Sequence, residues 1–170
     1  MTQKSGFFRT GQMFVPSNQV TPVPITNYTF IRAAANNVHL QKAANADTTH
    51  LQMSVRPFAM TSPARGFRIN TIDVVYEINI ADLTTHTAVL SSVVHANSTA
   101  AAVTAITQTG ALSILFADAD PLVTTLTVTT PTWITADHTD VRLEIEVVAP
   151  ATSTYDFHGV YVNFDYNTDS

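Results

Sequence analysis

The stretch from residue 72 to residue 80 reads Ile-Asp-Val-Val-Tyr-Glu-Ile-Asn-Ile. Every second residue is large and apolar, and Asp73, Glu77 and Asn79 fall between them. A period of two places alternate side chains on opposite faces of a β-strand, with one face on a core and the other toward water. The stretch therefore predicts a half-buried antiparallel strand. Its expected inner face holds Ile72, Val74, Tyr76, Ile78 and Ile80.

Alternation continues along most of the chain. Residues 141–147 repeat it cleanly as Val-Arg-Leu-Glu-Ile-Glu-Val. Shorter versions occupy 28–32, 38–40, 51–55, 88–94, 103–107 and 122–128, with a turn expected at 97–99 and one helix candidate at 110–117. Many short strands separated by turn residues are typical of a sandwich or jelly roll. We expect residues 28–170 to form one all-β domain, a single antiparallel β-sandwich that is jelly-roll-like, with about eight strands.

The last strand needs an irregularity. Tyr155 and Phe157 share one parity, whereas the apolar residues from Val160 onward share the other. A β-bulge at His158-Gly159 would return both sets to the core, because one extra residue shifts the alternation and glycine tolerates a positive φ. The common core is expected to contain Ile72, Val74, Tyr76, Ile78, Leu143, Ile145, Val147, Val162 and Phe164.

Composition narrows the possible functions. The chain has 170 residues, no Cys, 12% charged residues and a net charge of −5. Residues 1–46 carry four basic and no acidic side chains, but these charges are spread too far apart for a nucleic-acid arm, so no direct nucleic-acid partner is expected. The sequence has no run of 18 apolar residues and no apolar segment typical of a secretory signal at its start, so no membrane partner is expected.

Residues 1–27 predict an extended N-terminal arm. Pro16, Pro22 and Pro24 disfavour a regular helix, yet the segment is too apolar to remain in water. Two interpretations stay open: the arm packs on its own sandwich, or it docks on another subunit. The residues expected to make the inter-subunit docking contacts are Phe7, Phe8, Phe14, Val15, Val23 and Ile25.

Catalytic signatures are missing from the sequence. It contains no glycine-flanked serine elbow, HExxH, P-loop or GxGxxG motif. We therefore expect no enzyme activity, no catalytic residue, no cofactor and no metal. The carboxylate pairs Asp118/Asp120 and Asp137/Asp140 fit turns better than calcium loops, and Trp133 fits a buried loop residue better than a sugar platform.

Histidines lack the spacing of metal ligands. They occur at His39, His50, His86, His95, His138 and His158. None is paired with another at a spacing of two or four residues, so each is expected to be a structural strand residue. His158 is the strongest candidate for a functional role, because side chains beside a bulge are re-aimed.

Residues 66–167 resemble the β-sandwich or jelly-roll structural proteins of phage virions and bacterial surfaces. The resemblance lies in an Ile/Val/Tyr-alternating strand at 68–78, a Thr-rich strand at 126–131 (Leu-Thr-Val-Thr-Thr-Pro) and a closing strand at 159–166 (Gly-Val-Tyr-Val-Asn-Phe-Asp-Tyr). It implies an oligomeric module attached to a virion or displayed on a surface.

The main functional expectation is a structural virion protein, either capsid-associated or of the decoration type. It would be made in the host cytoplasm and would assemble as a homo-oligomer with other structural subunits through its sandwich and arm. The alternative is a carbohydrate-binding or adhesive module on an extracellular surface, possibly a filament subunit, with a glycan as its partner.

Overall fold

Two antiparallel β-sheets make up the chain in a computed structural model, which describes residues 7–33, 37–57, 66–96, 100–116, 121–134 and 139–168. The first sheet has the strand order β3-β4-β12-β6-β10-β9, with β1 also paired to β12. The second has the order β2-β5-β11-β7-β8. The expected all-β sandwich is confirmed, with twelve strands in the described residues in place of about eight.

The strands of the first sheet are β1 (Phe7–Pro16), β3 (Tyr28–Ala33), β4 (Asn37–Lys42), β6 (Phe67–Asn79), β9 (Gln108–Thr109), β10 (Leu122–Val128) and β12 (Thr154–Thr168). Those of the second are β2 (Thr21–Val23), β5 (Thr48–Ser54), β7 (Thr85–Ala96), β8 (Ala100–Ile106) and β11 (Thr139–Val148). Two single 3-10 turns, η1 (Ser17–Gln19) and η2 (Ile25–Asn27), lie between the early strands.

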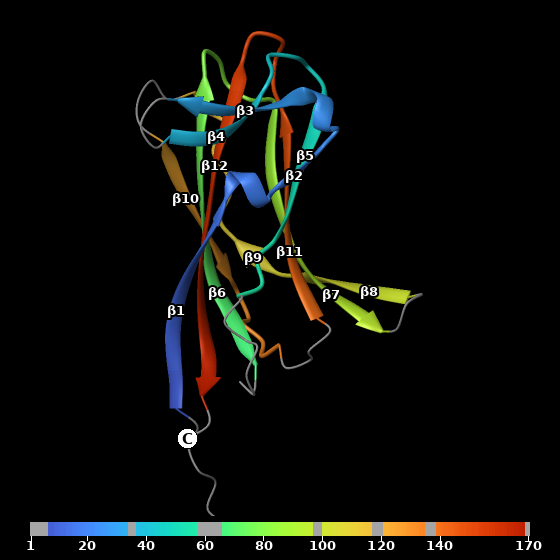
Figure 1. The fold of residues 1–170 in the computed structure, drawn as a ribbon, viewed down its shortest axis with the longest axis vertical. Helices are drawn as coiled ribbons and strands as arrows, with labels where there is room; N and C mark the ends of the chain where they lie inside the picture. Colours follow the sequence, from blue (N-terminus) through green and yellow to red (C-terminus); the bar gives the residue numbers. More distant parts are fainter. Residues whose placement is uncertain are drawn as a thin grey trace, which may run out of the picture.

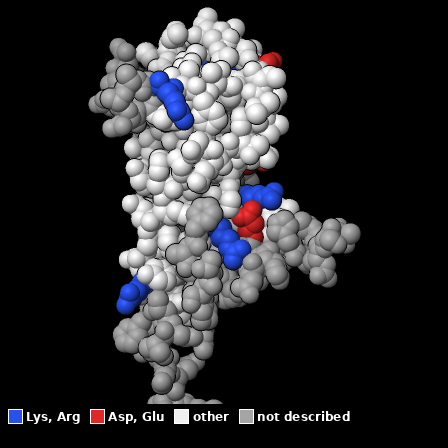
Figure 2. All heavy atoms as spheres, in the orientation of Figure 1, with Lys and Arg blue, Asp and Glu red and all other residues white. Residues whose placement is uncertain are grey.

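The long strands β1, β6 and β12 run along the length of the molecule, and β3 and β4 cross near one end (Figure 1). The β7–β8 hairpin projects from the body near the other end (Figure 1). Few charged side chains appear on the face shown in Figure 2, as expected for a sequence with 12% charged residues. Neutral polar and apolar groups therefore cover most of this face.

The predicted core is confirmed. Ile72, Val74, Tyr76, Ile78, Leu143, Ile145, Val147, Val162 and Phe164 are all buried. Ile80 is the exception to the predicted inner face of β6, because the strand ends at Asn79 and Ile80 adopts φ 80° in the following turn. Its side chain is 69% exposed. The apolar alternation in the sequence thus extends one residue past the end of the strand.

The bulge in β12 is also confirmed. Phe157 pairs with Tyr76 and Gly159 pairs with Val75, so His158 is the extra residue. Gly159 has a φ of 144°, a backbone conformation that residues other than glycine rarely adopt. A second register shift lies between Asn163 and Phe164.

The helix candidate at 110–117 was wrong. Residues 110–116 form an irregular segment, and its first residue, Gly110, has a φ of 105°. Residue 117 lies outside the described residues. Leu112 enters the core, and the Ser113 N–H donates to the Tyr76 hydroxyl at 2.9 Å. These tertiary contacts hold the segment in place without regular secondary structure. The turn expected at 97–99 also lies outside the described residues.

Residues 7–27 follow the expected extended path, but they lie within the sandwich of the same chain. All ten residues of β1 pair with β12, and β2 pairs with β5. Val15, one of the residues expected to dock on another subunit, is only 1% exposed and belongs to the core of its own chain.

Candidate binding groove

The groove forms where one edge of β12 changes partner. β4 pairs with residues 155–157 of β12, whereas β1 pairs with residues 159–168. The change falls at His158, the extra residue of the bulge. Here β1 ends at Pro16 and η1 turns across, contacting both β4 and β12. The bulge and the end of β1 thus leave an open space beside the β3–β4 hairpin.

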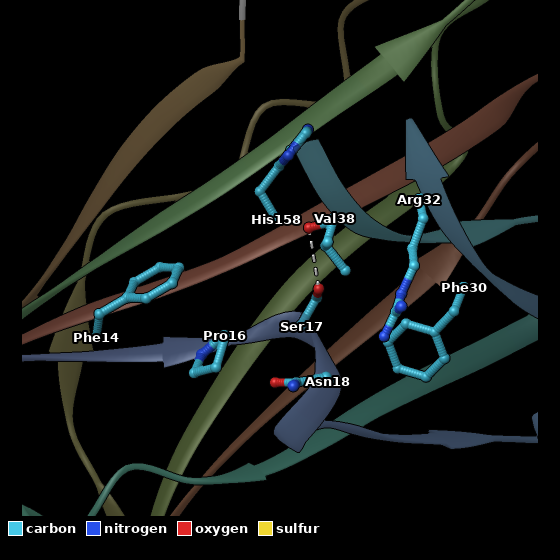
Figure 3. Close-up of a pocket in the computed structure, with 8 residues that line it drawn as sticks. All are labelled: Phe14, Pro16, Ser17, Asn18, Phe30, Arg32, Val38 and His158. Atoms are coloured by element: carbon cyan, nitrogen blue, oxygen red, sulfur yellow. Dashed lines mark hydrogen bonds between the residues drawn. The ribbon is translucent and has the colours of Figure 1, made fainter. Parts of the chain in front are cut away.

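That space is a groove of about 700 Å³, within the range of small-molecule sites in proteins. Its lining comes from β1, η1, β3, β4 and β12, as Figure 3 shows. The lining residues are Phe14, Pro16, Ser17, Asn18, Phe30, Arg32, Val38 and His158. Phe14 lies on one side of the view, and Phe30 and Arg32 lie on the other (Figure 3).

Two exposed phenylalanines flank the groove. Phe14 is 45% exposed and Phe30 is 49% exposed. The Phe14 ring packs 4.7 Å from the ring of Tyr161, centroid to centroid. A Cβ atom on Gly159 would lie 2.8 Å from two carbons of the Phe14 ring and 2.6 Å from the Val15 carbonyl oxygen. The glycine of the bulge is therefore required for Phe14 to lie flat against β12.

The polar side chains of the groove differ in how they are held. The buried Ser17 hydroxyl donates to the Val38 carbonyl oxygen at 3.3 Å, which fixes η1 on β4. Asn18 and Arg32 are exposed. Phe30 and Arg32 are two residues apart on β3 and share one face of that strand. The groove therefore offers two flat apolar surfaces next to amide and guanidinium donors.

His158 connects the groove to a buried polar cluster. Its Nε2 lies 3.1 Å from Glu77 Oε1, and its ring centroid lies 5.3 Å from that of His39. His39 Nε2 is 3.8 Å from Asp156 Oδ2, which accepts a hydrogen bond from the Asn79 amide at 2.9 Å. Burial lowers the pKa of His158, and the negative charge of Glu77 acts in the opposite direction.

Two other described histidines, His86 and His50, lie away from the groove lining. His86 is buried between the sheets, and His50 Nδ1 lies 3.0 Å from Glu144 Oε1 on the second sheet. The side chains of His95 and His138 lie outside what the structure describes. Within the described residues, no group of three or more His, Asp or Glu side chains is arranged to hold a metal ion. The bulge histidine is the one that reaches the groove.

Of the remaining sequence candidates, the described ones, Asp140 and Trp133, do not line the groove. Asp118, Asp120 and Asp137 fall outside the described residues, and Asp140 accepts hydrogen bonds from Ser54 and Arg142. The Arg68 guanidinium lies 5.2 Å from the centroid of the Trp133 ring. The described residues include no helix long and apolar enough to span a membrane.

Among the predicted docking residues whose side chains are described, Phe14 alone lines the groove. Val23 and Ile25 are exposed around β2 and η2, and the side chains of Phe7 and Phe8 are outside the description. Sequence reasoning missed Phe30 and Arg32, which were assigned to a strand without a site. The sequence signal for this site was an aromatic residue two positions before an arginine. The sequence could not show that both side chains are exposed, because their exposure depends on how far β3 extends beyond the core.

Comparison with known proteins gives limited information. No family model and no curated protein matches the chain. One similar solved structure contains the CBM22-1–GH10 modules of the Clostridium thermocellum endo-1,4-beta-D-xylanase 10B complexed with xylohexaose (TM-score 0.45, 10% identity, 92% of this chain and 27% of that chain). Another is TmCBM61 in complex with beta-1,4-galactotriose (TM-score 0.40, 8% identity, 91% of this chain and 86% of that chain). At these TM-scores, neither likeness carries weight for the function of this chain.

Proposed function

We propose that the chain is a non-catalytic module that binds a segment of a polysaccharide in the groove and acts on an extracellular surface. The observation that carries this proposal is the pair of exposed rings, Phe14 and Phe30, across one groove with polar donors nearby. The C–H faces of a sugar ring are apolar and its rim is polar. Aromatic rings match the faces, and amide and guanidinium groups match the hydroxyls.

The lining supports binding in preference to catalysis. Glycoside hydrolysis generally requires two carboxyl groups on either side of the scissile bond. The described residues that line the groove include neither Asp nor Glu. Glu77 and Asp156 lie behind His158 and are engaged with His158, His39 and Asn79. The groove therefore has the features of a site that holds a chain without cleaving it.

The test is gel electrophoresis of the whole chain through soluble polysaccharides, both neutral (xylan, galactan, mixed-linkage glucan) and acidic (polygalacturonate, alginate). At least one polymer is expected to retard the protein. Phe30→Ala should weaken that binding about tenfold, because it removes one stacking surface. Phe116→Ala is the matched control, since Phe116 is exposed but does not line the groove.

Two results would contradict the proposal. One is migration unaffected by any of the polymers. The other is an equal loss of binding in the Phe30→Ala and Phe116→Ala variants, because the groove would then have no special role. The melting temperature of both variants should match that of the parent chain, which shows that the fold is intact.

A second candidate function is the self-assembling structural subunit expected from the sequence, in a virion or another particle. Exposed apolar side chains around β2 and η2 favour it, above all Ile25, which is 71% exposed, and Val23. Exposed apolar groups that lie close together often mark interfaces between subunits. A native mass at a fixed multiple of 18.4 kDa would support this function, whereas a monomer at micromolar concentration would count against it.

A further inference from the structure

We propose that the groove selects acidic polysaccharides, with Arg32 pairing to the carboxylate of a uronic acid residue. This inference rests on the proposed function and specifies its ligand class. The groove carries the positive charge of one guanidinium group, and its described lining residues include no carboxylate.

Unlike Arg68 and Arg142, Arg32 has no acidic partner within the described residues. Arg68 forms an ion pair with Asp165 at 2.9 Å, and Arg142 forms one with Asp140 at 3.0 Å. No such pair involves Arg32, although its side chain is exposed at the groove. Arg32 is therefore available to an external anion.

Two other basic residues of the leading segment, Lys42 and Arg9, cannot take this role. Lys42 is buried, and its Nζ donates to the carbonyl oxygens of Ala43 and Asn45 and to the side chain of Asn45. Arg9 lies near the opposite end of β1, paired in register with Tyr166. Lys4 is outside the described residues. Among the described residues, the positive charge of residues 1–46 thus reaches the groove through Arg32.

The geometry of β3 favours a carboxylate that is attached to a sugar ring. Residues two apart on one strand face lie about 7 Å apart along the chain, close to the size of one sugar unit. A ring stacked on Phe30 would place its carboxylate, or that of the next unit, beside Arg32. The guanidinium group can donate two parallel hydrogen bonds to a carboxylate, which a hydroxymethyl group cannot match.

The experiment compares polymers that differ only in the carboxylate. Polygalacturonate and alginate are each tested beside their carboxyl-reduced forms by calorimetric titration into the whole chain. We expect at least one acidic polymer to bind about tenfold more tightly than its reduced form, with affinity that decreases as salt is added. Arg32→Gln should abolish this preference, so that the variant binds the acidic polymer no more tightly than the reduced form.

Arg142→Gln is the matched control, because it removes one exposed positive charge from the second sheet. The preference for the acidic polymer should survive in this variant. Loss of the preference in both variants would show a general effect of net charge and would overturn the role of Arg32.

The outcomes separate the two proposals. If neutral polymers bind and neither acidic polymer binds more tightly than its reduced form, the acidic specificity is wrong and the polysaccharide module stands. If no polymer binds, acidic or neutral, both proposals are wrong. If Arg32→Gln keeps the full preference, the carboxylate is recognised elsewhere and the inference is overturned.

Discussion

His86 is the residue whose burial has the clearest consequence for stability. Its Nδ1–H donates to the Ser113 carbonyl oxygen at 2.8 Å, and its Nε2 lies 3.1 Å from the Tyr155 hydroxyl, which can donate to it. The Tyr76 ring packs edge-on at 4.6 Å. Burial lowers the pKa of His86 from 6.5 to about 4. The neutral imidazole is therefore the form that the folded chain holds.

The sign of the pH dependence follows from this shift. Between pH 6.5 and pH 4 the unfolded chain binds a proton at His86 that the folded chain does not. This contribution to the free energy of unfolding is complete above pH 6.5 and is lost progressively as the pH falls to about 4. Its size is about 3 kcal/mol, obtained from the size of the pKa shift.

Urea denaturation at pH 4 to 7 measures this effect. His86→Gln should lower stability at pH 7 and flatten the pH dependence. His50→Gln, which removes a half-buried histidine beside Glu144 on the second sheet, is the comparison variant. An unchanged slope in His86→Gln would show that another group causes the loss at low pH.

At the scale of elements, β1 is the strand whose role the sequence left open. Val15 lies in the core, whereas Val23 in β2 is 43% exposed. Val15→Ala should reduce the free energy of unfolding by about 2 kcal/mol, because it removes two buried methyl groups and leaves a cavity. Val23→Ala makes the same chemical change on the surface, where about 0.5 kcal/mol or less is expected.

Chemical denaturation together with native mass separates packing within the chain from docking between chains. If Val15→Ala retained its stability and instead broke up an oligomer, β1 would be an inter-subunit arm in solution. We expect Val15→Ala to lose more free energy of unfolding than Val23→Ala.

Several elements could be predicted from the sequence because a pattern of neighbouring residues determines them. The inner face of β6 follows from alternation between residues 72 and 78, and the bulge in β12 follows from the change of parity after Phe157. The segment after Gly110 could not be predicted, since contacts with Tyr76 and Asp82 hold it in place. Ile80 fits the pattern but lies beyond the end of its strand.

The groove belongs to the whole molecule, and no single element contains it. It requires the end of β1 at Pro16, the change of partner along β12 and the reach of the β3–β4 hairpin beyond the core. These features bring together residues 14–18, 30–32, 38 and 158, which are far apart in the sequence. Period-two reasoning assigned most of these residues to strands, but it could not show that their exposed ends face one another.

The most direct test of the binding groove is the mapping of backbone amide chemical shifts during titration with two hexasaccharides, one from the acidic and one from the neutral polymer that retards the chain most in electrophoresis. We expect at least one of these probes to change the amide chemical shifts of residues 14–18, 30–32, 38–39 and 158–161. The amide shifts of β5, β7 and β11 should stay the same. Shifts confined to the second sheet, or none with either probe at millimolar concentration, would contradict this expectation.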